Sequence, residues 1–217
     1  MSKVVLDAMS YVAANSTSNH LDFHWFHHLK NVAMAARMYG VFMGLEENVI
    51  VNFEAAAWFH DTDHLGELDT YVWAQRHYPV FDAIQPESNI SNALNAFYLF
   101  SQSNSEAMKV LDAVLIPKLM KGTKFPYEVQ NGLTNDEQEW VNGLRDADQL
   151  ASRLFYTPQE VARMLSAERE LEYDSFIRTQ PDYVRNLRPK TKWWQMIYEQ
   201  HAPRVLEILA PYDSNVV

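Results

Sequence analysis

The stretch AAAWFHDTDHLG, residues 55–66, decides how the rest of the chain is interpreted. Its first half is an apolar helical run, and this run ends in the pair His60-Asp61. A buried imidazole beside a buried carboxylate is costly unless a charged group receives both, and a divalent metal ion binds a neutral ring nitrogen and an ionised oxygen together. We therefore interpret His60 and Asp61 as two metal ligands.

Two ligands do not hold a catalytic metal, so further ligands must come from elsewhere in the chain. Two segments contain suitable side chains. One is FHWFHHLKNV, residues 23–32, and the other is DADQL, residues 146–150. The first precedes the central stretch and the second follows it at a distance, and each lies in a predicted helix.

These three segments, in this order, resemble the HD-domain superfamily of metal-dependent phosphohydrolases. A match to the segment YHxxxHxxxV of its small bacterial members assigns the first ligand to His28, and a match to DADxL assigns the last ligand to Asp148. The resemblance covers residues 24–155 and does not include the tail. It implies an all-α, HD-domain-like helical bundle with extra C-terminal helices.

The implied ligand set of His28, His60, Asp61 and Asp148 offers two nitrogens and two carboxylate oxygens, which suits Mn, Fe, Co, Ni, Zn or Mg. Members with two metals carry two further His residues before the last Asp, and that longer pattern is absent here. We expect one divalent metal ion, which lowers the pKa of a bound water and neutralises charge on a phosphoryl group. The expected substrate is a nucleotide or a related small phosphorylated molecule.

Acid–base candidates follow the metal pair directly. His64 lies four residues after His60, shares its face on a continuing helix, and is placed to protonate a leaving oxygen or to bind a phosphate. A solvent-exposed or helix-capping role for His64 is the alternative. The segment HDxxH is similar to that of deoxynucleoside triphosphate hydrolases, whereas related 5'-deoxynucleotidases have Glu at that place. Asp63 and Glu67 are the other candidates for orienting the water.

Substrate contacts are sought among cationic and aromatic side chains near the ligand segments: Lys118, Lys121, Lys124, Arg145, Trp25 and His24. The three lysines recur at every third position and suit phosphate, although such a series is also typical of a solvated helix face. Trp25 is able to stack on a base or to pack in the core. We expect Asp146 to stand behind the ligands and to hold a ligating His.

Composition limits the other classes of function. The 217 residues carry a net charge of −10 and no Cys, which excludes disulfides, thiolate zinc sites and a cysteine nucleophile. The negative charge argues against broad binding of nucleic acids or membranes. We expect a cytoplasmic protein with a phosphohydrolase core at residues 1–156 and a helical extension at residues 157–217 packed on the same domain.

Helical periodicity, capping residues and Pro positions predict the elements, and no strand-like alternation is present. The predicted helices span residues 4–14, 22–40, 46–60, 67–77, 91–100, 106–120, 134–155, 161–173 and 192–210, with breaks at Pro181, Pro189 and Pro203. Two starts have capping residues, Thr134 with Glu137 and Thr157 with Glu160.

Two other functions stay open at this point. One is a degenerate HD domain that binds a nucleotide or a partner without turnover. In that case the tail around Trp193, Trp194 and Ile197 forms a homo-oligomer or partner interface. The alternative role of these three side chains is to close the core. The second is a zinc protease, because HDTDH resembles HExxH. That alternative leaves His28 and Asp148 unused.

Overall fold

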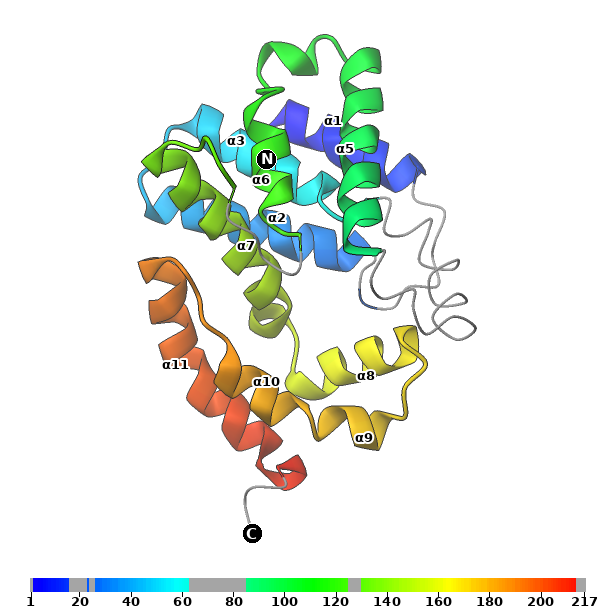
Figure 1. The fold of residues 1–217 in the computed structure, drawn as a ribbon, viewed down its shortest axis with the longest axis vertical. Coiled ribbons are helices and arrows are strands. Elements are labelled where there is room, and N and C mark those ends of the chain that lie inside the picture. The colour runs from blue at the N-terminus through cyan, green and yellow to red at the C-terminus, as the bar shows by residue number, and fades with distance from the viewer. Residues whose placement is uncertain (1, 16–22, 24–25, 63–84, 125–129, 214–217) are drawn as a thin grey trace.

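The structure is a computed structural model that describes residues 2–15, 23, 26–62, 85–124 and 130–213 (Figure 1). Every regular element in these ranges is helical, which confirms the all-α prediction. The helices are α1 (Lys3–Asn15), α2 (Phe26–Phe42), α3 (Glu47–Phe59), α5 (Gln85–Ser103), α6 (Leu115–Lys121), α7 (Asn135–Phe155), α8 (Pro158–Glu168), α9 (Tyr173–Ile177), α10 (Gln180–Asn186) and α11 (Lys192–Leu209). None of them is long and apolar enough to cross a lipid bilayer.

Helix α3 forms the centre of the main core. Its residues 50–59 are all buried, because α1, α2, α5, α6 and α7 pack around it. The small side chains of 55–57 let neighbouring helices approach closely, and an apolar surface on every side requires burial on every side. The end of α3, where His60 follows, is therefore held inside the protein.

The meeting point of α2, α7 and α11 depends on Gly143. A Cβ atom added there would lie 2.2 Å from Cε1 of Tyr39, so α7 passes directly over the tyrosine ring. The Gly143 carbonyl accepts a hydrogen bond of 3.1 Å from Nε1 of Trp194 in α11. Tyr39 is fully buried and its hydroxyl donates to Oε1 of Glu139 at 3.2 Å.

We expect the substitution Gly143→Ala to lower the free energy of unfolding by about 2–3 kcal/mol, because the new methyl group overpacks a filled site. Phe53 and Trp193, with ring centroids at 6.0 and 5.8 Å from that of Tyr39, leave the ring little room to retreat. Urea unfolding measures the effect. In a Tyr39→Leu background the same substitution should lower the free energy of unfolding by less. Helix propensity alone would make Gly143→Ala stabilising, and that result would contradict the packing argument.

Two predicted helix starts are confirmed. Thr134 and Glu137 form a reciprocal capping box at the start of α7, in which Thr134 Oγ1 accepts from the Glu137 backbone N–H and Glu137 Oε2 accepts from that of Thr134. Thr157 and Glu160 repeat this arrangement at the start of α8, with Pro158 in its first turn. These local signals fix where α7 and α8 begin.

The predicted continuous helix over 106–120 is confirmed only from Leu115 onward. The structure has a short 3-10 turn at Ala107–Lys109 and then α6 from Leu115. Asp112 separates the two, since its Oδ1 accepts from the backbone N–H groups of Val114 and Leu115 at 2.7 and 2.9 Å. The Asp112 backbone N–H donates in turn to Oδ1 of Asn52 in α3 at 2.7 Å. This contact with a distant helix outweighs the local helical periodicity.

Other boundaries also differ from the sequence prediction. Helix α8 ends at Glu168 rather than near residue 173, and Glu170 adopts a positive φ of 51° just beyond it. Pro203 lies inside α11 and does not end it. Helix α5 begins at Gln85, earlier than expected. The predicted helix 67–77 falls outside the described residues.

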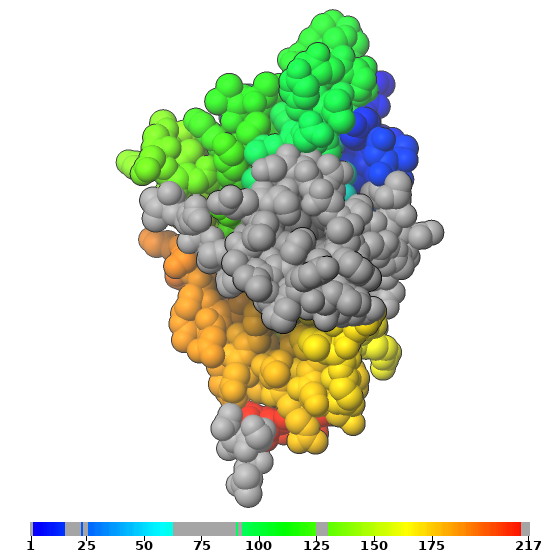
Figure 2. All heavy atoms as spheres, turned by 45° about the vertical axis from the view of Figure 1, so that its right-hand side comes forward, coloured from blue at the N-terminus to red at the C-terminus, as the bar shows by residue number. Residues whose placement is uncertain are grey.

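The C-terminal helices α8–α11 have a small apolar cluster of their own: Ala162, Ile177, Val184, Ala202 and Leu209. Figure 1 shows α7 running from the first group of helices toward this second one, and in Figure 2 the yellow and orange residues gather at the opposite end of the molecule from α5. Trp193 and Trp194 belong to the main core and are 6% and 0% exposed. The two tryptophans therefore close the core.

Candidate metal centre

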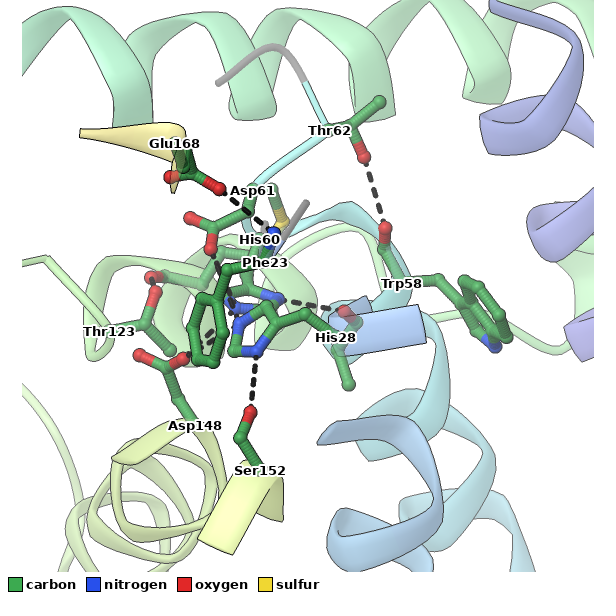
Figure 3. A network of polar contacts seen from close by, with 12 residues as sticks. Phe23, His28, Trp58, His60, Asp61, Thr62, Thr123, Asp148, Ser152 and Glu168 are labelled. Carbon is green, nitrogen blue, oxygen red and sulfur yellow. Dashed lines mark hydrogen bonds and ion pairs between the residues drawn. The ribbon is translucent and has the colours of Figure 1, made fainter. Parts of the chain in front are cut away.

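Three helices bring the four expected ligands together. His28 lies in the first turn of α2, His60 directly follows α3, Asp61 comes next, and Asp148 lies in α7. One ligand atom from each of them lies within 4.8 Å of all the others. Figure 3 shows both imidazoles and both carboxylates pointing toward one another. The sequence prediction that these four side chains converge is therefore confirmed.

The distances between the ligand atoms fit the coordination shell of one ion. Nε2 of His28 lies 3.2 Å from Oδ1 of Asp148 and 3.5 Å from Oδ2 of Asp61. For Nε2 of His60 the same two distances are 3.4 and 3.3 Å. Charged N–H···O hydrogen bonds are shorter, about 2.7–2.9 Å. Neighbouring donors that each lie about 2.1 Å from a metal ion are separated by about 3.0 Å in octahedral and about 3.4 Å in tetrahedral geometry.

The other ring nitrogen of each histidine faces a hydrogen-bonding group. Nδ1 of His60 donates to the carbonyl of Ala57 at 2.7 Å, and Nδ1 of His28 lies 3.3 Å from Oγ of Ser152. Because a carbonyl only accepts, the Ala57 contact fixes the neutral His60 tautomer with the lone pair on Nε2, and the Ser152 hydroxyl is able to accept from Nδ1 of His28 in the same tautomer. Metal-binding histidines are commonly oriented in this way. Both Nε2 atoms are thus prepared to act as ligands.

Burial and charge shift the pKa values of the cluster. Burial is the largest single effect on His60 and lowers its pKa, but Asp61 and Asp148 together outweigh it and hold that pKa well above its usual value. The pKa of His28 is raised by the same balance. Burial raises the pKa of Asp148, but the two histidines outweigh it and lower that pKa to about 2. Without a metal, the carboxylates therefore favour the protonated form of both imidazoles.

We expect a divalent ion to stabilise the protein, and more strongly at higher pH. In the metal-free protein the raised histidine pKa values give stability that is present below about pH 6.5 and is lost as the pH rises through the folded-state values. Metal binding needs neutral imidazoles and releases their protons. Metal affinity therefore increases at the higher pH where the imidazoles have already lost these protons. At 100 times the Kd, metal adds about 2.7 kcal/mol, which raises Tm by about 5–10 °C for a chain of this size.

Thermal unfolding at pH 6 and pH 8, with Mn, Co, Ni, Zn or Mg and then with a chelator, measures this increase. A Tm that no divalent ion changes at either pH would contradict a metal centre.

Asp146 has a different partner from the one expected. Its carboxylate accepts from the backbone N–H of Lys190, at 2.9 Å to each oxygen, and from the backbone N–H and the hydroxyl of Thr191 at 2.8 and 3.1 Å. Burial raises the pKa of Asp146 to about 6, and these donors act against it. Residues two apart on a helix point in nearly opposite directions, so Asp148 faces the ligands and Asp146 faces the extension.

Two predicted substrate contacts have structural partners. Lys118 donates to Oε1 of Glu137 at 2.6 Å and joins α6 to α7. Arg145 is buried, and its Nε donates to the carbonyl of Gly122 at 2.9 Å. That bond holds the loop after α6, whose Thr123 belongs to the polar network that Figure 3 draws around Asp61 and Asp148. Lys121 is exposed, and Lys124 directly follows Thr123.

The candidates His64, Asp63, Glu67, His24 and Trp25 lie outside the described residues. Their roles in acid–base chemistry and substrate binding stay predictions.

The sequence-based prediction did not include several residues near the ligands. Ser152 follows Asp148 by four positions, so the helical spacing would have placed its hydroxyl on the ligand face. Thr123 gave no comparable signal. Glu168 accepts a 3.0 Å hydrogen bond from the backbone N–H of Phe23, 145 residues away, and no local pattern indicates such a contact.

Comparison with protein-family models, with curated proteins and with solved structures found no significant match. The relation to the HD-domain superfamily therefore stays a prediction from the sequence.

Proposed function

We propose that this protein is a metal-dependent phosphohydrolase that cleaves a phosphoester or phosphoanhydride bond in a nucleotide or a related small phosphorylated molecule. The observation that carries the proposal is the convergence of His28, His60, Asp61 and Asp148, with ligand atoms within 4.8 Å of one another. Two nitrogens and two carboxylate oxygens are a donor set for a hard or borderline divalent ion. Such an ion, when bound, activates a water and neutralises phosphoryl charge.

The protein leaves the carboxylate side of the cluster more open than the imidazole side. The side chains of Asp61 and Asp148 are 20% and 19% exposed, whereas those of His28 and His60 are 3% and 0% exposed. A substrate and a water would approach past the carboxylates. The buried histidines fix the position of the ion from behind.

A phosphorylated substrate needs local cations in a chain whose net charge is −10. Lys124 is suited to this role, because the loop that Arg145 holds through Gly122 continues into it. The zinc-protease alternative gives no role to His28 and Asp148, although both belong to the cluster with His60 and Asp61.

The experiment is a hydrolysis screen over nucleoside monophosphates, diphosphates, triphosphates and cyclic dinucleotides, each with Mn, Co, Ni and Mg. We expect phosphate or nucleotide release that a chelator abolishes and that added metal restores. Tight nucleotide binding without any metal-dependent product would favour the degenerate, non-enzymatic domain. Release that persists in a His60→Ala variant would assign the activity to a contaminant.

A further inference from the structure

Glu168, the last residue of α8, connects the C-terminal extension to the neighbourhood of the metal ligands. Its side chain lies near Asp61 in Figure 3, and the residue is only 7% exposed. Its Oε2 accepts a 3.0 Å hydrogen bond from the backbone N–H of Phe23. The contact joins two segments that are 145 residues apart in the chain.

The position of this carboxylate is unfavourable for α8 itself. A negative charge in the last turn of a helix opposes the helix dipole, at a cost of about 0.3–1 kcal/mol. Burial of the charge adds a desolvation cost. Neither helix formation nor solubility explains Glu168 at this place. The hydrogen bond to Phe23 offsets part of these costs.

Phe23 in turn lies against a metal ligand. The centroids of its ring and of the His28 imidazole are 5.2 Å apart, with the ring planes 33° from parallel. The edge of the imidazole is held by Ser152, whose Oγ lies 3.3 Å from Nδ1. Rotation of the His28 ring is therefore limited by Ser152 at its edge and by Phe23 on its face.

We infer that Glu168 is a positioning residue of the metal centre: it fixes the backbone of Phe23, and Phe23 holds the His28 ring in its metal-binding orientation. The extension thus completes a site whose four ligands all come from residues 28–148. This inference rests on the metal centre of the proposed function. It assigns no direct contact with metal or substrate to Glu168.

The test is a titration of the metal-free full-length protein with Co²⁺, followed by its visible absorption bands. We expect Glu168→Ala to weaken Co²⁺ binding about 10-fold, the range for loss of a group that orients a ligand. Glu168→Gln should stay within about 3-fold of the unsubstituted protein, because its amide oxygen still accepts from the Phe23 N–H. Glu199→Ala, at an exposed Glu of the same extension, is the matched control and should change nothing.

Phe23→Ala should reproduce the loss, and combining it with Glu168→Ala should add little, since both act through one contact. If Glu168→Ala does not fold, Glu168→Asp carries the test, because its shorter side chain does not reach the N–H.

Three results would overturn the inference: unchanged Co²⁺ affinity and spectrum in Glu168→Ala, equal losses in the Gln and Ala variants, or additive effects of the Phe23 and Glu168 substitutions. Failure of the unsubstituted protein to bind Co²⁺ at all would instead refute the proposed function.

Discussion

Asp148→Asn is expected to abolish metal binding and to reduce phosphate release at least about 1000-fold, which corresponds to about 4 kcal/mol in the activation free energy. The carboxylate oxygen lies 3.2 and 3.4 Å from the two histidine Nε2 atoms, so it would be a neighbouring ligand of both imidazoles. An amide of the same size supplies no negative charge to a divalent ion.

The clearest measurement for Asp148→Asn compares Tm with and without metal. The variant should keep its helical circular dichroism and its cooperative unfolding, yet gain no stability from the ion. Asp136→Asn, at an exposed position in the first turn of α7, is the matched control and should respond like the unsubstituted protein. A metal-dependent rise in Tm that survives in Asp148→Asn would remove Asp148 from the ligand set.

In contrast to Asp148→Asn, Asp146→Ala should leave metal binding nearly unchanged and lower the free energy of unfolding by about 3–5 kcal/mol. The loss follows from two backbone N–H groups and one hydroxyl, from Lys190 and Thr191, that would lose their acceptor in a buried place. Thr191 also caps α11, where its Oγ1 accepts from the backbone N–H of Trp194. The substitution therefore loosens the start of α11 as well.

Chemical denaturation of the metal-free protein measures the Asp146 effect. Asp146→Asn should lose about half as much stability, since one amide oxygen still accepts from Thr191. Below its lowered Tm, Asp146→Ala should bind Co²⁺ with nearly unchanged affinity. A loss of stability under about 1 kcal/mol, or loss of metal binding in a folded variant, would contradict the assignment of Asp146 to the extension.

The sequence predicted those features that depend on near neighbours or on residue chemistry. The starts of α7 and α8 are set by capping boxes four residues long, so they were visible without tertiary information. The ligand cluster was predicted because the donor types at His28, His60, Asp61 and Asp148 match a pattern, and the helices carry the residues to one point.

The remaining features depend on contacts between segments distant in the chain. Helical spacing separates the directions of Asp146 and Asp148, but the partner of Asp146, the backbone of residues 190–191, could not be seen in the sequence. The break at Asp112 follows from its bond to Asn52, 60 positions earlier. Glu168 lies in a segment that the family resemblance does not cover. Local periodicity contains none of this information.

Three of the four ligands come from the N-terminal part of the chain, and the fourth lies far from them in sequence. His28, His60 and Asp61 arrive with the adjacent helices α2 and α3, whereas Asp148 arrives with α7 after a further long segment. Closing the longer loop costs more entropy, so we expect the contacts of α7 with α2 and α3 to form after those between α2 and α3. We therefore expect an ion bound by ligands from both parts to slow unfolding more than it speeds folding.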